Sequence, residues 1–386
     1  MRVLSIGLMV LLSIAAFVGW RILSARMYMG PPVSYRATWS PSAAAQFLDQ
    51  REAWWQSWPP AHEDHSTLCI SCHTVVPYAL ARPELRQQPG EPRATAEEQV
   101  MLASVEKRVT DWPSMIPFYS DAKDGPGKTA QSHATEAVLN AIILASYDAN
   151  HGHLRPVTRR AFDEVWALQL PSGQNAGGWP WQDFHLAPWE SADSGYSGAA
   201  MLAIALEHAP DDYAADPAVA PHVQRLAVYL QRLYPTQPLM SQLYVLWASA
   251  SIPDLLTEPQ RTSLLQRIKD LQQPDGGWTL FSLDREDSWA ALASSTQSDG
   301  CATGLVALAL EQSGTDPHAA ILQRGLNWLA HHQTTDGSWR AISLNKRRNL
   351  RTDIGLFMTD AATGYAVMAL EQPKPPATNT ADARSH

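Results

Sequence analysis

A chain of 386 residues is long enough for two or three folding units with an ample hydrophobic core. Charged residues make up 17% and hydrophobic residues 45% of it, which excludes a disordered protein, and three cysteines are too few for a disulfide scaffold. The net charge of −9 and the absence of a long basic run argue against a nucleic acid as partner, and 15 tryptophans point to recurring packing positions.

The chain begins with an apolar segment from Val3 to Trp20, which carries no charge and lies between Arg2 and Arg21. A helix of this length spans about 27 Å, enough to cross the core of a bilayer. We therefore expect residues 1–35 to be a signal anchor and linker. A cleaved signal peptide is the alternative, although no clean small-x-small cleavage site is present. Both interpretations place the rest of the chain outside the cytoplasm.

Residues 69–73, Cys-Ile-Ser-Cys-His, have the form Cys-x-x-Cys-His, the attachment signal of haem c. Two thiols at this spacing can each form a thioether with a haem vinyl group, and the adjacent imidazole can bind the iron. The motif therefore predicts Cys69 and Cys72 as attachment residues, His73 as the proximal iron ligand, and haem c as the cofactor. Because haem c is attached outside the cytoplasmic membrane, the body of the protein is expected on the periplasmic side.

Other sites also use a Cys-x-x-Cys pair. A redox disulfide of the thioredoxin type belongs to a βαβ unit, and no such pattern surrounds residues 69–73. A zinc site needs further ligands, and the remaining cysteine, Cys301, is far along the chain with no second pair. Haem attachment thus remains the favoured interpretation of the motif.

Two amphipathic helices, at 42–58 and 95–112, bracket the motif and could enclose a porphyrin. Residues 36–129 partly resemble a compact cytochrome c domain, in which a methionine on a loop supplies the distal iron ligand. The resemblance suggests that role for Met115, although here the methionine follows the second helix, between two prolines, whereas in the family it precedes the last helix. The histidines and an open iron site are the alternatives; the histidines are His62, His65 and His133.

From residue 130 onward, helix-length apolar patterns alternate with turns marked by Gly and Pro, and no strand pattern interrupts them. Three turns share one signature, at 173–181, 271–280 and 332–341, and each precedes a helix that begins with small residues. The predicted helices are 135–149, 158–169, 198–208, 221–233, 240–249, 258–272, 303–311, 318–332 and 363–371.

The turn signature has a physical interpretation. Asp-Gly or Gly-Gly supplies a left-handed turn, and the Trp that follows folds back to fill the joint between repeats. These turns resemble the Q-x-x-D-G-x-W repeats of the squalene cyclase and protein prenyltransferase superfamily, whose fold is an α/α toroid. The resemblance implies a toroid over residues 130–372, incomplete or irregular because only four to five helix pairs can be counted. Residues 373–386 are predicted to be a disordered tail.

The acidic residues of this region complete neither the acid motif of the cyclases nor the zinc site of the prenyltransferases. The Asp-x-Asp-Asp acid motif of the cyclases is absent, and Asp211 and Asp212 lie in an Ala/Pro setting typical of capping acids. Asp299 and Cys301 match the first two zinc ligands of the prenyltransferases, but residues 360–363 contain no histidine to complete the set. Neither a cyclase nor a prenyltransferase is therefore favoured.

The sequence predicts an all-α protein, with an N-terminal transmembrane helix, a small cytochrome c-like segment and an α/α toroid. The expected function is one-electron transfer on the periplasmic side of the bacterial inner membrane, with a redox partner protein and the toroid as a docking or substrate-holding module. The alternatives are an enzyme that processes haem or a terpenoid in the toroid, with an apolar ligand as partner, and a haem-free binding scaffold.

Overall fold

The computed structural model describes residues 33–86, 93–119, 125–252, 254–283, 297–346 and 348–371. These residues form twelve α-helices, α2 to α13, and a single short hairpin of β1 (His62–Glu63) and β2 (Thr67–Leu68). The expectation of an all-α protein is confirmed for this part of the chain. The predicted transmembrane helix and the C-terminal tail lie outside the described residues, and no described helix combines the length and apolarity needed to cross a bilayer.

Two kinds of helix alternate along the chain, and their burial distinguishes them. Helices that bury one face form an outer layer, whereas helices that are buried over most of their surface form an inner layer. The outer helices are α2 (Pro41–Ser57), α4 (Ala96–Thr110), α6 (Pro156–Leu168), α8 (Ala220–Leu233), α10 (Glu258–Leu271) and α12 (Ala320–His331). The inner helices are α3 (Val75–Leu85), α5 (Gly125–Ala149), α7 (Ser194–His208), α9 (Leu239–Ala248), α11 (Gly300–Gln312) and α13 (Phe357–Leu370).

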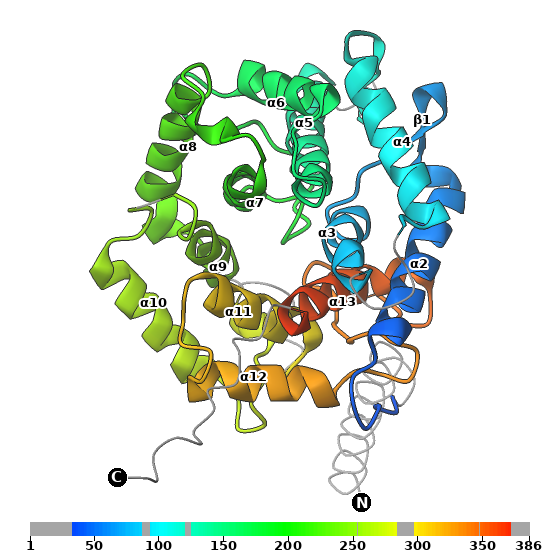
Figure 1. Cartoon of the computed structure of the whole chain (residues 1–386), viewed down its shortest axis with the longest axis vertical. Coiled ribbons are helices and arrows are strands. Elements are labelled where there is room, and N and C mark those ends of the chain that lie inside the picture. The colour runs from blue at the N-terminus through cyan, green and yellow to red at the C-terminus, as the bar shows by residue number, and fades with distance from the viewer. Residues whose placement is uncertain are drawn as a thin grey trace, which may run out of the picture.

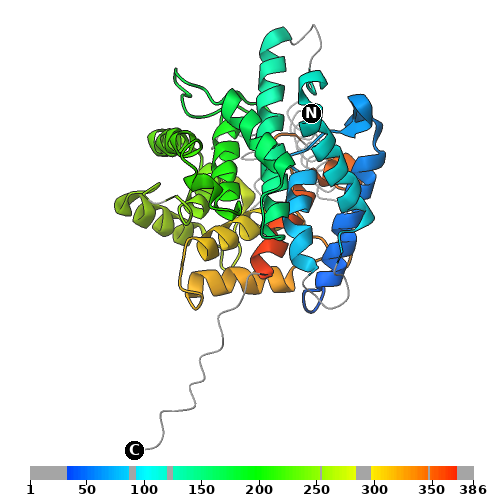
Figure 2. The ribbon, with the colours of Figure 1, turned by 45° about the horizontal axis from the view of Figure 1, so that its top comes forward.

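The inner helices form a closed ring. Each of α3, α5, α7, α9 and α11 packs against the inner helix that follows it, and α13 packs back against α3 (Figures 1 and 2). The described residues therefore contain six helix pairs, which corrects the expectation of an incomplete toroid with four to five pairs. The pairs that the sequence did not reveal are built from α2 to α5, whose turns lack the repeated signature.

The three signature turns form the same joint between neighbouring outer helices. Gly177, Gly276 and Gly337 have φ angles of +91°, +99° and +95°, the left-handed conformation that glycine adopts without strain. A Cβ atom at any of them would lie within 2.8 Å of a main-chain oxygen of the next outer helix. Those oxygens belong to Arg225, Arg324 and Ala43.

A glutamine side chain ties each turn to the next outer helix. Its Nε2 donates to the carbonyl of the turn glycine and to a carbonyl at or near the start of the following helix. These glutamines and their partners across the joint are Gln169 with His222, Gln272 with Ile321, and Gln333 with Ser40, at 2.8–3.1 Å. Since Ser40 caps α2, the last turn joins the end of the ring to its beginning.

The signature tryptophans seal the joints from the inside. The indole N–H groups of Trp179, Trp278 and Trp339 each donate at 2.8 Å to a carbonyl of the preceding outer helix. Trp278 and Trp339 are fully buried. The prediction that these residues fill the joints between repeats is confirmed.

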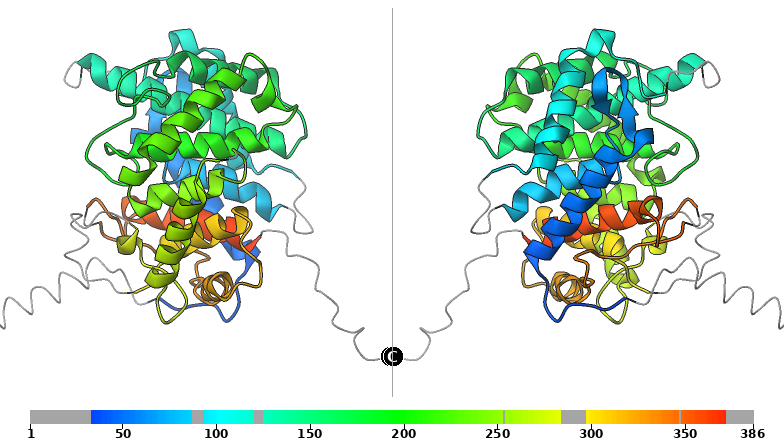
Figure 3. Two further views of the ribbon diagram at one scale, coloured as in Figure 1. Left: turned by 90° about the vertical axis from the view of Figure 1, so that its left-hand side faces the viewer. Right: turned by 90° about the vertical axis from the view of Figure 1, so that its right-hand side faces the viewer.

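Residues 36–129 do not form a unit of their own. Their helices α2, α3 and α4 are members of the ring, and the expected boundary at residue 130 falls inside α5. Tyr35 pairs with Thr334 as an isolated β-bridge, and α2 packs on α13, so the first described segment lies beside the last (Figure 3). The expectation of a separate cytochrome c-like segment is therefore wrong, because the apolar faces of these helices are buried against the ring.

Candidate functional site

A cavity of about 270 Å³ lies inside the ring, near the start of several inner helices. Its wall combines the segment before α3, the first residues of α13, part of α5, and the loops that lead into α7 and α13. Segments from both ends of the chain therefore meet there. The motif at residues 69–73 forms one side of this wall.

Local hydrogen bonds explain the conformation of the motif. The amide of Cys69 donates to Ala61, and the indole of Trp55 donates to the Cys69 carbonyl at 2.9 Å. The Ser71 hydroxyl accepts from the amides of Thr74 and Val75, which stabilises the turn that precedes α3. The motif is thus a capped turn that leads into an inner helix.

Cys69 and Cys72 line the cavity as free thiols. Burial raises the pKa of both thiols well above its usual range, so they remain protonated at neutral pH. A redox-active pair needs a lowered thiol pKa, which this environment does not provide. No cluster of three or more metal-binding side chains occurs among the described residues.

The His73 imidazole is enclosed by aromatic rings. It stacks on Phe357 with ring centroids 3.8 Å apart, while Trp55 and Trp189 lie at 5.4 and 5.5 Å. Burial, together with the positive charges of Arg348 and Arg51, lowers the pKa of His73 to about 3. The side chain is therefore neutral at physiological pH, the form that binds a metal ion.

The hydrogen bonding of His73 leaves one ring nitrogen available. Nδ1 lies 2.9 Å from the hydroxyl oxygen of Thr74, and Nε2 forms no hydrogen bond within the described part of the chain. Together with the two thiols, this nitrogen gives the donor set of a covalently attached haem on the wall of one cavity. The residues present therefore fit the cofactor that the motif predicts.

The cavity also contains polar groups that the sequence did not reveal. Glu136 forms a buried ion pair with Arg108, and Glu63 has a pKa raised to about 7, mainly by burial. Gln182 is only 5% exposed, and neither atom of its amide has a partner among the described residues. Arg348 lies over the Phe357 ring, with its guanidinium carbon 5.4 Å from the ring centroid. The Gln182 amide is therefore available to a polar group in the cavity.

A second chamber of about 460 Å³ adjoins the first. The two spaces share Cys72, Leu139 and Trp189 as wall residues. The second wall includes four serines and residues at the start of α7. Cys72 of the motif therefore borders both chambers.

The structure does not bring Met115 to either cavity. It is buried, and its backbone lies beside His133, on the segment between α4 and α5. His62, His65 and His133 do not line the cavities either. Met358, the second residue of α13, does line the first cavity. Its sequence position, almost 300 residues from the motif, carried no signal that could have identified it.

The other acidic candidates have structural roles. Asp211 accepts from the amide of Leu154 and pairs with Arg159. Asp299 caps α11 by accepting from the amides of Cys301 and Ala302. Their carboxylates therefore satisfy main-chain and side-chain donors, which is the role expected of capping acids.

Comparison with known proteins finds a family that matches the second part of the ring. Residues 238–373, which contain α9 to α13, match the family described as squalene-hopene cyclase C-terminal domain. This part of the chain is squalene cyclase-like. No curated protein matches the sequence. Among solved structures, a glycosyl hydrolase of family 88 from Bacteroides vulgatus shares 13% identity at a TM-score of 0.34, over 93% of this chain and 98% of that one.

Proposed function

We propose that this protein is a c-type haem protein whose haem is held inside the helix ring and exchanges single electrons with a partner protein. The observation that carries the proposal is the common position of Cys69, Cys72 and His73 on the wall of one cavity. A neutral imidazole with a free Nε2 and two unpaired thiols is the set of groups that haem c requires.

Each group would have a distinct task. Cys69 and Cys72 would hold the cofactor covalently, and His73 would bind the iron. Trp55, Trp189 and Phe357 supply apolar walls that exclude water, which raises the strength of every polar contact inside. Bound haem would supply a one-electron Fe(III)/Fe(II) couple.

We place the protein on the periplasmic side of the inner membrane, held by the apolar segment at residues 3–20. Attachment of haem through two thioethers takes place outside the cytoplasm, so the motif and an export segment belong together. The ring would then present the haem to a redox partner protein.

The test is haem attachment to the full chain in a bacterial host with cytochrome c maturation. We expect an intact mass increased by one haem and a c-type absorption spectrum. Cys69→Ser and Cys72→Ser should each lose one thioether, whereas Cys301→Ser, a change at a fully buried cysteine on α11, should keep both. Colourless wild-type protein with both thiols free to alkylate would overturn the proposal and leave a haem-free binding scaffold.

A second function is favoured by the unpaired Gln182 amide and the adjoining chamber. They provide room and hydrogen-bonding groups for a small molecule beside the motif, so the ring would be an enzyme that acts on a ligand next to the haem. This candidate predicts an iron position open to added imidazole or carbon monoxide, whereas a pure electron carrier predicts a closed, low-spin iron.

A further inference from the structure

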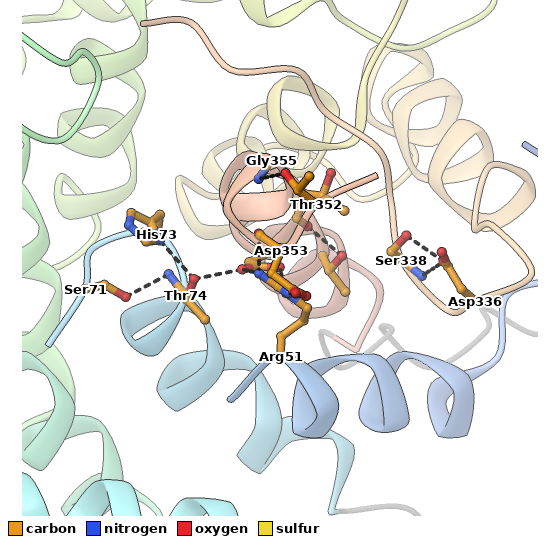
Figure 4. A network of polar contacts seen from close by, with 12 residues as sticks. Arg51, Ser71, His73, Thr74, Asp336, Ser338, Thr352, Asp353 and Gly355 are labelled. Atoms are coloured by element: carbon orange, nitrogen blue, oxygen red, sulfur yellow. Dashed lines mark hydrogen bonds and ion pairs between the residues drawn. The ribbon is translucent and has the colours of Figure 1, made fainter. Parts of the chain in front are cut away.

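We infer that Thr74, Asp360 and Arg51 are positioning residues that hold His73 as an Nδ1–H donor, with Nε2 free for iron, and thereby lower the reduction potential of the haem. The inference rests on the proposed function, because it concerns the imidazole that would bind the iron. Figure 4 shows His73, Thr74 and Arg51 in the same polar network. The chain of contacts runs from His73 through Thr74 and the Asp360 carboxylate to Arg51.

The contacts are short and buried. The Thr74 hydroxyl donates to Oδ2 of Asp360 at 2.8 Å, and it lies 2.9 Å from Nδ1 of His73. Arg51 holds the same carboxylate with two bonds, from Nε at 2.7 Å and from Nη2 at 3.0 Å. Thr74, Asp360 and Arg51 are each at most 5% exposed.

The direction of each hydrogen bond follows from the groups involved. An ionised carboxylate can only accept, and the two bonds from Arg51 stabilise Asp360 in that form. The Thr74 hydroxyl has one proton, and this proton goes to Asp360. Its oxygen must then accept from His73, which fixes the proton on Nδ1 and leaves the Nε2 lone pair for the metal.

The repeats show that Asp360 is not required by the joint itself. Thr303 in α11 and Thr363 in α13 occupy equivalent positions, because each hydroxyl accepts from the amide of a signature tryptophan. Three residues before them stand Gly300 and Asp360. The position of Asp360 is therefore taken by a glycine in α11, whose own acid, Asp299, stands one residue earlier and caps that helix.

Close packing of α13 on α3 brings Asp360 near Thr74. A Cβ atom at Gly364 would lie 2.6 Å from Cβ of Pro77, so this glycine permits close contact between the two inner helices. Thr74 and Asp360 are separated by 286 positions in the chain, and closure of the ring places them in hydrogen-bond contact. The surroundings of His73 thus depend on the contact between α3 and α13 that closes the ring.

The chemical consequence concerns the electron density of the imidazole. A ring whose N–H is bonded towards a carboxylate is a stronger donor to a metal, which favours Fe(III) over Fe(II). The positioning residues should therefore shift the midpoint potential to lower values. Loss of the acceptor at Thr74 should shift it to higher values.

The experiment compares Thr74→Val, which lacks the hydroxyl, with Thr74→Ser, which retains it, in the haem-loaded full chain. We expect Thr74→Val to retain the covalent haem with a midpoint potential more positive than that of the wild type. Thr74→Ser should have the same midpoint potential as the wild type. Asp353→Asn is the matched control, because Asp353 bonds to Nη1 of Arg51 but not to the Thr74 end of the chain.

A second measurement does not need the haem. Nitrogen-15 spectra of the unloaded protein, with His73 assigned from a His73→Gln variant, should show the proton on Nδ1 in the wild type and in Thr74→Ser. Thr74→Val should populate the other tautomer. A wild-type proton on Nε2, or equal potentials for both variants and the wild type, would overturn the inference. Failure of the wild type to attach haem would instead overturn the proposed function, and the nitrogen spectra would still decide the tautomer.

Discussion

The squalene cyclase-like part of the ring, α9 to α13, and the part around the motif, α2 to α5, have the same architecture but different means of holding it together. The former relies on glycine turns and buried indoles at its joints. The latter relies on buried arginines that bind carboxylates. These pairs are Arg51 with Asp360, Arg82 with Asp49, and Arg108 with Glu136.

The difference indicates where the ring carries function. A buried ion pair brings little net stability, because removing both charges from water costs about as much as their attraction returns. The indole joints close a ring without that cost. Buried charge is concentrated beside the motif, where Arg51 reaches the His73 contacts and Arg108 borders the cavity. Charge there positions groups, whereas the repeated joints provide stability.

The largest effect is expected from removal of an indole joint. Trp278→Ala should lower the free energy of unfolding by about 3–5 kcal/mol, because it leaves a cavity and an unpaired carbonyl at Ile268. Chemical denaturation of the full chain measures the loss. Trp112→Ala, at a partly exposed tryptophan beside His133, is the control and should cost much less. Equal losses for the two variants would show that the joints do not stabilise the ring in this way.

The next effect concerns a buried ion pair beside the cavity. Arg108→Met should destabilise the protein by about 3 kcal/mol, because it leaves the Glu136 carboxylate buried without its cation. The double variant Arg108→Met/Glu136→Gln removes both charges and should recover much of this loss in the same denaturation experiment. A double variant as unstable as the single one would mean that hydrogen bonds to Thr67 and Ile116, rather than the charge pair, account for the effect.

The smallest effect is a pH dependence from Glu52, a fully buried acid of α2. Burial raises its pKa from 4.5 to about 8, so the unfolded chain loses the proton at lower pH than the folded protein. The free energy of unfolding should therefore fall as the pH rises from 4.5 to 8. The groups that act on this carboxyl are Gln56, Asp360, Glu97 and Asp49.

Glu52→Gln removes this titration and tests its sign. The variant should be more stable than the wild type at pH 8 by on the order of 2 kcal/mol, and the difference should vanish below about pH 4.5. Glu207→Gln, at an exposed position of α7, is the control and should leave the pH profile unchanged. A variant less stable than the wild type at pH 8 would contradict the expected burial effect.

Much of the fold follows from local sequence patterns. Predicted helices at 158–169, 258–272 and 318–332 correspond to α6, α10 and α12 within two residues, because apolar spacing and helix caps are local properties. The left-handed glycines and buried tryptophans of the signature turns were also predictable. The six-pair ring was not, since the turns between α2 and α5 lack that signature and the same helical spacing suits a separate small domain.

The candidate site divides in the same way. The Cys-x-x-Cys-His spacing is contained in five consecutive residues, so the sequence alone determined the thiols and the imidazole as its chemical groups. Their surroundings come from distant segments: Phe357 stacks on His73, and Asp360 accepts from Thr74. Only the tertiary structure decided these contacts, because hydrogen bonds and ring contacts between residues almost 300 positions apart exist once the ring has closed and leave no pattern in the local sequence.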